Sequence, residues 1–411
     1  MLLDKEFPPD VRVRREAIAL IEAGYRVILL CRNLQKQKTS EVIDGIHIQR
    51  LPAFHIASTA IRKIISKPVF FNPAYIIKAM GIIRTNSICG IHVHDLPLAP
   101  LAIILSQILQ VPAIVDFHED YPAMIRSEKR QGLQGLLFNN LHLLEYIEKW
   151  VLAHSKNVIS VSHENTARIE SMGLSDLKCI TLMNVVDLDE FILPREIYAD
   201  DPPPYKILYT GIIGPARGLE LIIHSLSKLT EKHKNSIILH IVGDGKARIK
   251  LEQQCHKYNL ERQIQFLGMV PRDHLSSFVL QSHICIIPHE PNDHTNSTIP
   301  NKIFEFMAAK KPVIVSNTIP MQKIVNATQC GVVFDYQKPD SFNEALVSLI
   351  ESKDLRNKLG ENGFRNVQET YNWNHEKRKL IHLYDQIIKE SLNNSEILRY
   401  TDVSPKINHT K

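Results

Sequence analysis

The sequence predicts an α/β protein with two doubly wound, parallel β-sheet domains. Short, uninterrupted apolar runs alternate with helical patterns along the chain, and such runs are typical of parallel strands that helices cover on both faces. The pattern starts again after a proline-rich stretch near the middle. The length of 411 residues also suits two domains of roughly 100 to 200 residues each.

The first domain is predicted over residues 1–195. Its expected strands are 26–31, 90–95, 112–117 and 157–162. Between the second and third of these, the uncharged run from Leu96 to Val115 is long enough to span a bilayer. Its prolines and central polar residues instead favour a buried helix that leads into a buried strand.

The start of the chain departs from the usual pattern of such domains, which begin with a buried strand. Only Met1 to Leu3 precede Asp4, and residues 8–31 already have the pattern of a loop, a helix and the second strand. We therefore expect the first strand to be missing and the true start to lie upstream of Met1. A very short first strand is the alternative.

A proline-rich linker over residues 193–205 leads into the second domain, predicted over residues 204–370. Its expected strands are 206–211, 237–243, 264–268, 284–288 and 312–316. Residues 371–392 form an amphipathic helical pattern with one apolar stripe, which needs a partner face. Residues 393–411 are a polar tail.

Composition narrows the function classes. A net charge of +5 without a basic stripe argues against a nucleic-acid partner. Six scattered cysteines without a CxxC pair, and no signal-peptide pattern, favour the cytoplasm. Metal-ligand spacings are absent as well, so we expect no metal site. Average usage predicts roughly 29 glycines, but the chain has 16, which argues against a glycine-rich phosphate loop.

The strongest motif lies in residues 295–316. Ser297 or Thr298 is expected to cap a helix in which Lys302 and Glu305 are three residues apart on one face. A helix start offers backbone N–H groups that suit a diphosphate, and a carboxylate one turn later could accept hydrogen bonds from a ribose diol. The alternative is an ordinary capped helix with a surface ion pair.

This motif and four others, in this order along the chain, resemble the GT4-type retaining glycosyltransferases of the GT-B fold. The resemblance covers roughly residues 10–390 and rests on VDFHEDYP (115–122), NVVDLDEF (184–191), LYTGIIGPARGLELIIHSL (208–226), LHIVGDGKARIKLE (239–252) and PNKIFEFMAAKKPVI (300–314).

The resemblance implies two Rossmann-like domains facing each other across a cleft, with a final helix that crosses back to the first domain. The C-terminal domain would hold a nucleotide-diphosphate sugar and the N-terminal domain an acceptor. The sugar would be transferred with retention, without a metal or other cofactor. Basic side chains and helix N-termini would offset the charge that develops on the leaving diphosphate.

The resemblance also implies roles for single residues. Arg217 corresponds to the family's diphosphate-binding lysine. Where the family often has a further arginine, this chain has Ile212, and Lys302 would substitute. Glu305 matches the ribose-binding acid of the family's E-x7-E motif, whose first acid is replaced by Ser297. The sugar-facing contact stays open among Glu290, His294, Asn296 and Ser297.

Further nucleotide contacts are expected from Ser297, Thr298 and Asn301 and from the turn at Gly243 and Asp244, although that turn could be structural alone. The glycine that a dinucleotide motif needs at position 248 is an arginine, which argues against NAD.

His118 follows a buried strand of the first domain, where such folds bind ligands. The family places a histidine there near the donor sugar, which implies that His118 orients the sugar. Glu119 and Asp120 come next, and a lone His-Glu-Asp string is otherwise a common loop sequence. His94 and Asp95 end the preceding strand and are expected in the same crevice.

Residues 58–84 mix basic and apolar side chains, a pattern that can lie on an anionic membrane or be a solvated helix on its own core. We interpret the chain as a hexosyltransferase-like, retaining, metal-independent enzyme at the inner face of the cell membrane. Its acceptor would be a saccharide or lipid-linked saccharide, a precursor of a cell-surface polysaccharide or glycolipid. A catalytically inactive nucleotide-binding subunit and a sugar-nucleotide 2-epimerase are the alternatives.

Overall fold

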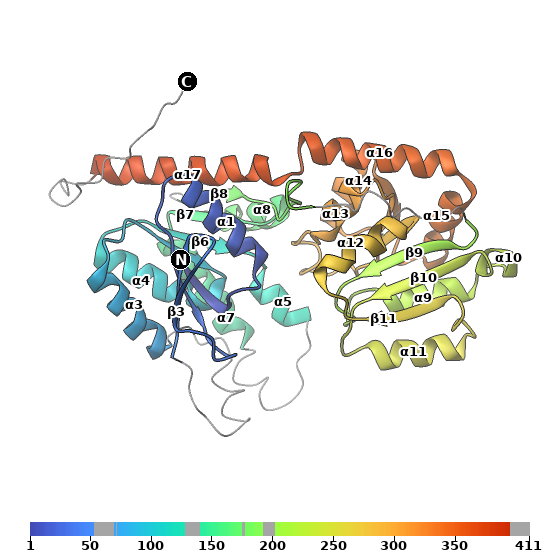
Figure 1. The fold of residues 1–411 in the computed structure, drawn as a ribbon, viewed down its shortest axis with the longest axis horizontal. Helices are drawn as coiled ribbons and strands as arrows, with labels where there is room; N and C mark the ends of the chain where they lie inside the picture. The colour runs from blue at the N-terminus through green and yellow to red at the C-terminus, as the bar shows by residue number, and fades with distance from the viewer. Residues whose placement is uncertain (53–69, 71, 128–139, 175–176, 192–201, 395–411) are drawn as a thin grey trace. The chain divides into compact units, whose positions relative to one another are not determined.

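The computed structural model describes residues 1–52, 70, 72–127, 140–174, 177–191 and 202–394 (Figure 1). The chain forms two compact units. Unit 1 comprises Met1–Pro122, Gln131–Leu182 and Glu376–Lys411, and unit 2 comprises Ala123–Arg130 and Met183–His375. Each unit contains one predominantly parallel sheet with helices on both faces, which confirms the predicted fold class.

The sheet of unit 1 has eight strands in the order β3-β4-β2-β1-β5-β6-β7-β8, and only β3 runs antiparallel to its neighbour. The strands are β1 Leu2–Glu6, β2 Ile28–Arg32, β3 Ser40–Ile43, β4 Ile46–Arg50, β5 Ile91–His94, β6 Ala113–Phe117, β7 Asn157–Ser160 and β8 Lys178–Thr181. The helices are α1 Val11–Glu22, α3 Pro73–Thr85, η1 Leu96–Leu98, α4 Ala99–Leu109, α7 Leu141–His154 and α8 His163–Glu170; α5 Tyr121–Ser127 crosses the unit boundary.

The first strand is present, so the expectation that it is missing is wrong. In β1, Leu2 pairs with Leu30 of β2 and with Val93 of β5, at the centre of the sheet. The strand extends beyond its short apolar part because its charged residues have partners. Asp4 accepts two hydrogen bonds from Arg32, at 2.6 and 2.8 Å. Charged residues are tolerated at the end of a buried strand when they are paired. For this reason the short apolar run alone did not predict the strand.

The uncharged run of unit 1 forms η1, α4 and β6, and most of its side chains are buried. This confirms the buried helix and strand expected there. Within the part of the chain that the structure describes, no helix has both the length and the apolar character needed to cross a membrane.

The last helix, α17 Trp373–Asn394, begins in unit 2, and from Glu376 onwards it belongs to unit 1, as predicted (Figure 1). Its stripe of Leu380, Leu383 and Ile387 is buried. Tyr384 on the same stripe hydrogen bonds through its hydroxyl to His92 Nδ1 of β5 at 2.8 Å. The helix is therefore tied to the central part of the unit 1 sheet.

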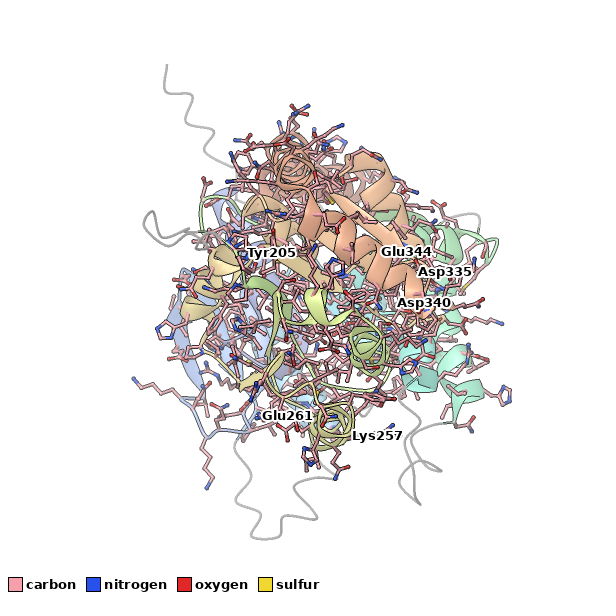
Figure 2. All side chains as sticks on the ribbon, turned by 90° about the vertical axis from the view of Figure 1, so that its right-hand side faces the viewer. Tyr205, Lys257, Glu261, Asp335, Asp340 and Glu344 are labelled. Atoms are coloured by element: carbon pink, nitrogen blue, oxygen red, sulfur yellow. The ribbon has the colours of Figure 1, made fainter. Side chains whose placement is uncertain are left out.

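The sheet of unit 2 has six parallel strands in the order β11-β10-β9-β12-β13-β14. They are β9 Tyr205–Thr210, β10 Ile237–Val242, β11 Ile264–Gly268, β12 Ile284–Ile287, β13 Val313–Ser316 and β14 Gly331–Phe334. The helices are α9 Leu219–Ser227, α10 Glu231–Lys234, α11 Arg248–Lys257, α12 Arg272–Gln281, α13 Lys302–Ala308, α14 Ile319–Thr328, α15 Pro339–Glu351 and α16 Lys353–Glu369. Tyr205, labelled in Figure 2, is the first residue of β9. The guanidinium of Arg356 lies 5.0 Å from its ring centre.

The order in which successive strands are added reverses at a central point of each sheet, although the strands there stay parallel. In unit 1 the reversal lies between β1 and β5, and in unit 2 between β9 and β12. Open α/β sheets bind ligands outside the carboxyl ends of the strands at such reversal points. The topology therefore selects one crevice in each unit as a candidate site.

Candidate functional site

In unit 2, the loops after β9 and β10 are hydrogen bonded to each other at the carboxyl ends of their strands. Gly211 N donates to Val242 O and Ile213 N donates to Asp244 O, each at 2.9 Å. Gly243 has a φ of +146°, and a Cβ there would lie 1.8 Å from Gly211 O. Only glycine fits so close a backbone approach. This packing gives Gly243 a structural role, whatever it contacts besides.

The loop after β9 is also held against the end of β12, which places Arg217 at the reversal point. Gly218 has a φ of +74°, and a Cβ there would lie 1.6 Å from Pro288 O. Next to it, Glu290 N donates to Ala216 O at 2.9 Å. The guanidinium of Arg217 consequently lies beside His289, with 3.3 Å between Arg217 Nη1 and His289 Nε2.

Lys302 reaches the same place from the start of α13. Its ammonium group donates to Thr210 O, at the end of β9, and lies 4.6 Å from the centre of the Tyr209 ring. Burial and the positive charge of Arg217, partly opposed by Glu305, together lower the pKa of Lys302 to about 7. Two basic groups this close together form a site suited to an anion, which would favour the charged form of Lys302.

His289 completes this group, and the sequence analysis missed it. It is buried, and its pKa is well below the usual value because of burial and the nearby charges of Lys302 and Arg217. Its carbonyl accepts a hydrogen bond from Ser316 Oγ at 2.5 Å. His289 follows an apolar strand run almost directly, as His118 does, and that shared position is the signal that could have identified it.

The start of α13 differs from the prediction. Neither Ser297 nor Thr298 caps the helix, because both hydroxyls donate to His294 O, at 2.9 and 3.0 Å, within the preceding turn. Asn301 occupies the cap position without a capping side-chain hydrogen bond. The expected cap was wrong because these hydroxyls stabilise the turn before the helix. Glu305 lies partly buried in the first turn of α13.

The other predicted nucleotide contacts of unit 2 have local partners. Asp244 is exposed, and its carboxylate accepts a hydrogen bond from Gly245 N at 2.7 Å. Asn296, a candidate for the sugar contact, accepts from Ile319 N at 3.0 Å. The structure therefore groups Arg217, Lys302 and His289 most tightly.

In unit 1, His118 belongs to a buried group that we call the histidine–carboxylate cluster. Its members are Glu16 of α1, His92 and His94 of β5, Asp116 of β6, and His118. His118 Nε2 lies 2.8 Å from Asp116 Oδ2 and 3.2 Å from His94 Nδ1. His94 Nδ1 in turn lies 3.1 Å from the same Asp116 oxygen. One carboxylate oxygen thus faces both imidazoles.

The two carboxyl groups of the cluster have opposite pKa shifts. Burial would raise the pKa of Asp116, but the charge of His118 and hydrogen bonds from three histidines hold it well below its usual value. Burial and the neighbouring Asp116 raise the pKa of Glu16 well above its usual value. These shifts favour the anionic form of Asp116 and the protonated form of Glu16.

This arrangement fixes the orientation of the His118 ring. With Nε2 donating to Asp116, Nδ1 is the nitrogen left for another group, and it is buried without a hydrogen-bond partner among the described residues. Burial and His92 also lower the pKa of His94 to about 3, so that His94 stays neutral. In the neutral form of His118, Nδ1 of the oriented ring can accept a hydrogen bond from a sugar hydroxyl.

Glu16, His94, Asp116 and His118 also offer ligand atoms that all lie within 4.8 Å of one another, close enough to hold a cation. The sequence analysis predicted no metal site, and this group could not be recognised from spacing because its members come from three elements.

The other residues predicted near His118 have structural partners. Asp95 has a φ of +68° and forms an ion pair with Lys5 at 3.2 Å. Asp120 forms an ion pair with Arg168 at 3.2 Å, and Arg168 also contacts Glu148. Of the HED string, His118 alone joins the histidine–carboxylate cluster.

The predicted membrane-facing segment is described only in part, since residues 58–69 and 71 lie outside the described residues. Its remainder includes α3, which carries Lys78 and Arg84. Ile77 of α3 is 74% exposed. The described part therefore presents basic and apolar side chains on one helix.

Comparison with known proteins gives two family matches. Residues 194–366 match the model described as Glycosyl transferases group 1, and residues 10–190 match the model described as Glycosyltransferase Family 4. An uncharacterized glycosyltransferase of Methanocaldococcus jannaschii, MJ1607, is 23% identical over 407 residues, which cover 92% of this chain and 96% of the relative.

Solved structures share the fold. Sucrose-phosphate synthase from Thermosynechococcus elongatus superposes with a TM-score of 0.75 at 17% identity, covering 95% of this chain and 98% of that one. HepE of Anabaena, solved in complex with UDP, superposes with a TM-score of 0.65 at 13% identity, covering 94% and 99%. At these identities the likeness defines the fold.

Proposed function

The chain belongs to glycosyltransferase family 4, whose members are retaining enzymes, and from this premise we propose its donor site and acceptor class. Unit 2 binds a nucleotide-diphosphate sugar at the reversal point between β9 and β12. The acceptor is a cell-surface polysaccharide or glycolipid precursor. We infer the donor site from the positions of Arg217 and Lys302, which meet beside His289 at the carboxyl ends of these strands.

Arg217 and Lys302 contact the diphosphate in different ways. Arg217 offers a planar fork that matches two phosphate oxygens, and Lys302 offers a compact charge. As the bond to the sugar breaks, negative charge grows on the diphosphate, and these preformed partners stabilise it. Glu305 accepts hydrogen bonds from the ribose, one turn into α13. The HepE structure contains UDP, which supports nucleotide binding by a protein of this fold.

His118 orients the transferred sugar, and Asp116 is a positioning residue for it. The 2.8 Å contact with Asp116 sets the ring so that Nδ1 can accept from a sugar hydroxyl. Gly243, Asp244, Ser297, Thr298 and Asn301 stay proposed contacts of the nucleotide. The basic and apolar side chains of α3 support an acceptor carried at the cytoplasmic face of an anionic membrane.

A panel of UDP-, GDP- and ADP-sugars tests this function. Release of the nucleoside diphosphate supports a transferase, conversion of one nucleotide sugar into another indicates an epimerase, and binding without turnover indicates an inactive subunit. Ile212 and Ser297, in place of the family's arginine and acid, are the residues that favour the inactive alternative.

Donor binding should take up protons at alkaline pH. The pKa of Lys302 is about 7 in the protein and 10.5 ordinarily, so at pH 8.5 its amine is mostly neutral when the site is empty. A bound diphosphate favours the charged form and raises this pKa. We expect uptake of up to about one proton per UDP or GDP bound at pH 8.5, and less at pH 6. Calorimetry in two buffers of different ionisation enthalpy measures it.

Lys302→Met is the control for this prediction, because it keeps the stem and removes the amine. The variant should bind the nucleotide more weakly and take up fewer protons. Equal uptake by the variant and the natural protein would mean that another group is titrated and that Lys302 does not contact the diphosphate.

A further inference from the structure

An apolar cavity of about 380 Å³ lies in unit 1 at the amino ends of the strands. Ile28 and Ile91, which begin β2 and β5, line it together with Leu2 of β1. Because parallel strands begin at one edge of a sheet, this cavity lies toward the edge opposite to His118, and His92 of the histidine–carboxylate cluster also lines it. Its side walls come from α1, α3, α4 and α17 and include Leu20, Ile83, Leu105, Ile387 and Ile388.

A second cavity, of about 590 Å³, adjoins the first. The residues that line both are Arg26, Ile28, Ile82, Thr85 and Asn86. The second cavity is also lined by Lys78, His47 and Gln49. None of the residues that line either cavity is an aspartate or glutamate, and neither Arg26 nor Lys78 forms an ion pair within the described part of the chain. A mainly apolar cavity therefore adjoins one whose lining includes the two basic side chains of Arg26 and Lys78.

We propose that these two cavities bind one anionic phospholipid of the membrane. An acyl chain occupies the apolar cavity, and the headgroup phosphate contacts Arg26 and Lys78. The volumes lie within the roughly 300 to 1,000 Å³ of small-molecule sites. A nucleotide or a sugar would leave the apolar cavity without a matching group, whereas an amphiphile with a negatively charged head complements both cavities.

The surroundings of the second cavity favour a lipid that comes from a bilayer. Ile77 lines this cavity and is 74% exposed, so an apolar side chain accompanies Arg26 and Lys78 at the surface. Basic and apolar side chains together are typical of surfaces that lie in the headgroup region of anionic membranes. The inference extends the membrane contact of the proposed function to a defined site and does not depend on sugar transfer.

Cys89 offers a direct probe, because it lines the apolar cavity and is exposed. The other cysteines are buried except Cys179, which is partly exposed. In a full-length Cys179→Ser protein, the rate of alkylation by a maleimide therefore reports on Cys89. We expect vesicles of phosphatidylglycerol and phosphatidylcholine to bind the protein at least tenfold more tightly than phosphatidylcholine alone, and to slow alkylation at least fivefold.

The paired variant Arg26→Glu/Lys78→Glu should lose both the preference for phosphatidylglycerol and the protection of Cys89. Lys149→Glu/Lys156→Glu is the matched control, because it changes the charge of unit 1 equally at exposed lysines that line neither cavity. The control should keep both properties. Equal thermal unfolding midpoints in the two pairs would show that a loss is not unfolding.

Three outcomes would overturn the proposal. If the control pair loses as much binding, the attraction is general and the cavity is not the site. If vesicles bind without slowing alkylation of Cys89, no acyl chain enters. If inorganic phosphate alone protects Cys89 as strongly, the site takes a free anion. Donor turnover measured without vesicles tests the sugar transfer separately, so a failure of one proposal leaves the other intact.

Discussion

Replacing Glu305 by alanine is expected to weaken nucleotide binding by roughly 10- to 100-fold while the fold is retained. Hydrogen bonds to a charged group contribute about 1.5 to 3 kcal/mol, and the proposed ribose diol would lose its carboxylate acceptor. The neighbours Ile303, Phe304 and Phe306 are buried and anchor α13 without Glu305. Calorimetric titration with UDP and GDP measures the affinity, and thermal unfolding checks the fold.

Two further variants sharpen this prediction. Glu305→Gln keeps a neutral acceptor and should bind with intermediate affinity. Glu344→Ala removes an exposed carboxylate from α15 of the same unit (Figure 2) and should leave binding unchanged. Normal turnover by Glu305→Ala would refute the ribose assignment, and an equal loss in Glu344→Ala would point to a general effect of charge.

Replacing His118 by alanine is expected to reduce turnover by roughly 100-fold or more, with a much smaller change in nucleotide affinity. Preformed groups that stabilise a developing charge contribute factors of roughly 10² to 10³, and His118 is proposed to face the sugar. Turnover under saturating donor, compared with the Kd for the nucleoside diphosphate, separates the two effects.

Asp116→Asn tests how His118 is held. Asparagine keeps the volume but removes the charge that accepts from His118 Nε2 at 2.8 Å, so kcat should fall while KM for the donor changes little. His142→Ala is a control for histidine loss, because that side chain is 98% exposed. If His118→Ala weakened nucleotide binding more than turnover, the role given to His118 would be wrong.

The repeated apolar runs were sufficient to predict the fold, because strands buried on both faces need uninterrupted apolar residues. They were insufficient at β1, where Asp4 is tolerated through its pair with Arg32. The helix cap was misassigned for a similar reason. Ser297 and Thr298 can each bind a carbonyl of the preceding turn as well as cap a helix, and a sequence does not reveal which bond forms.

The site was predictable where a residue lies in a motif and not where it depends on contacts across a sheet. Arg217, Lys302, Glu305 and His118 came from motifs. Asp116 was missed because a carboxylate inside a buried strand can be interpreted only once its neighbours are known. Here these are histidines of β5 and the histidine that follows β6. His289 was missed in the same way, since its partner Arg217 lies 72 residues away.

The most direct test of the central claim, that Arg217 and Lys302 hold the diphosphate of a sugar donor, is donor turnover by the natural protein and by Arg217→Ala and Lys302→Met. We predict that one nucleotide sugar of the panel yields free nucleoside diphosphate, and that each variant lowers this rate by roughly 10²- to 10³-fold. Turnover that is unchanged in both variants, or a natural protein that binds nucleotide sugars and never cleaves them, would contradict it.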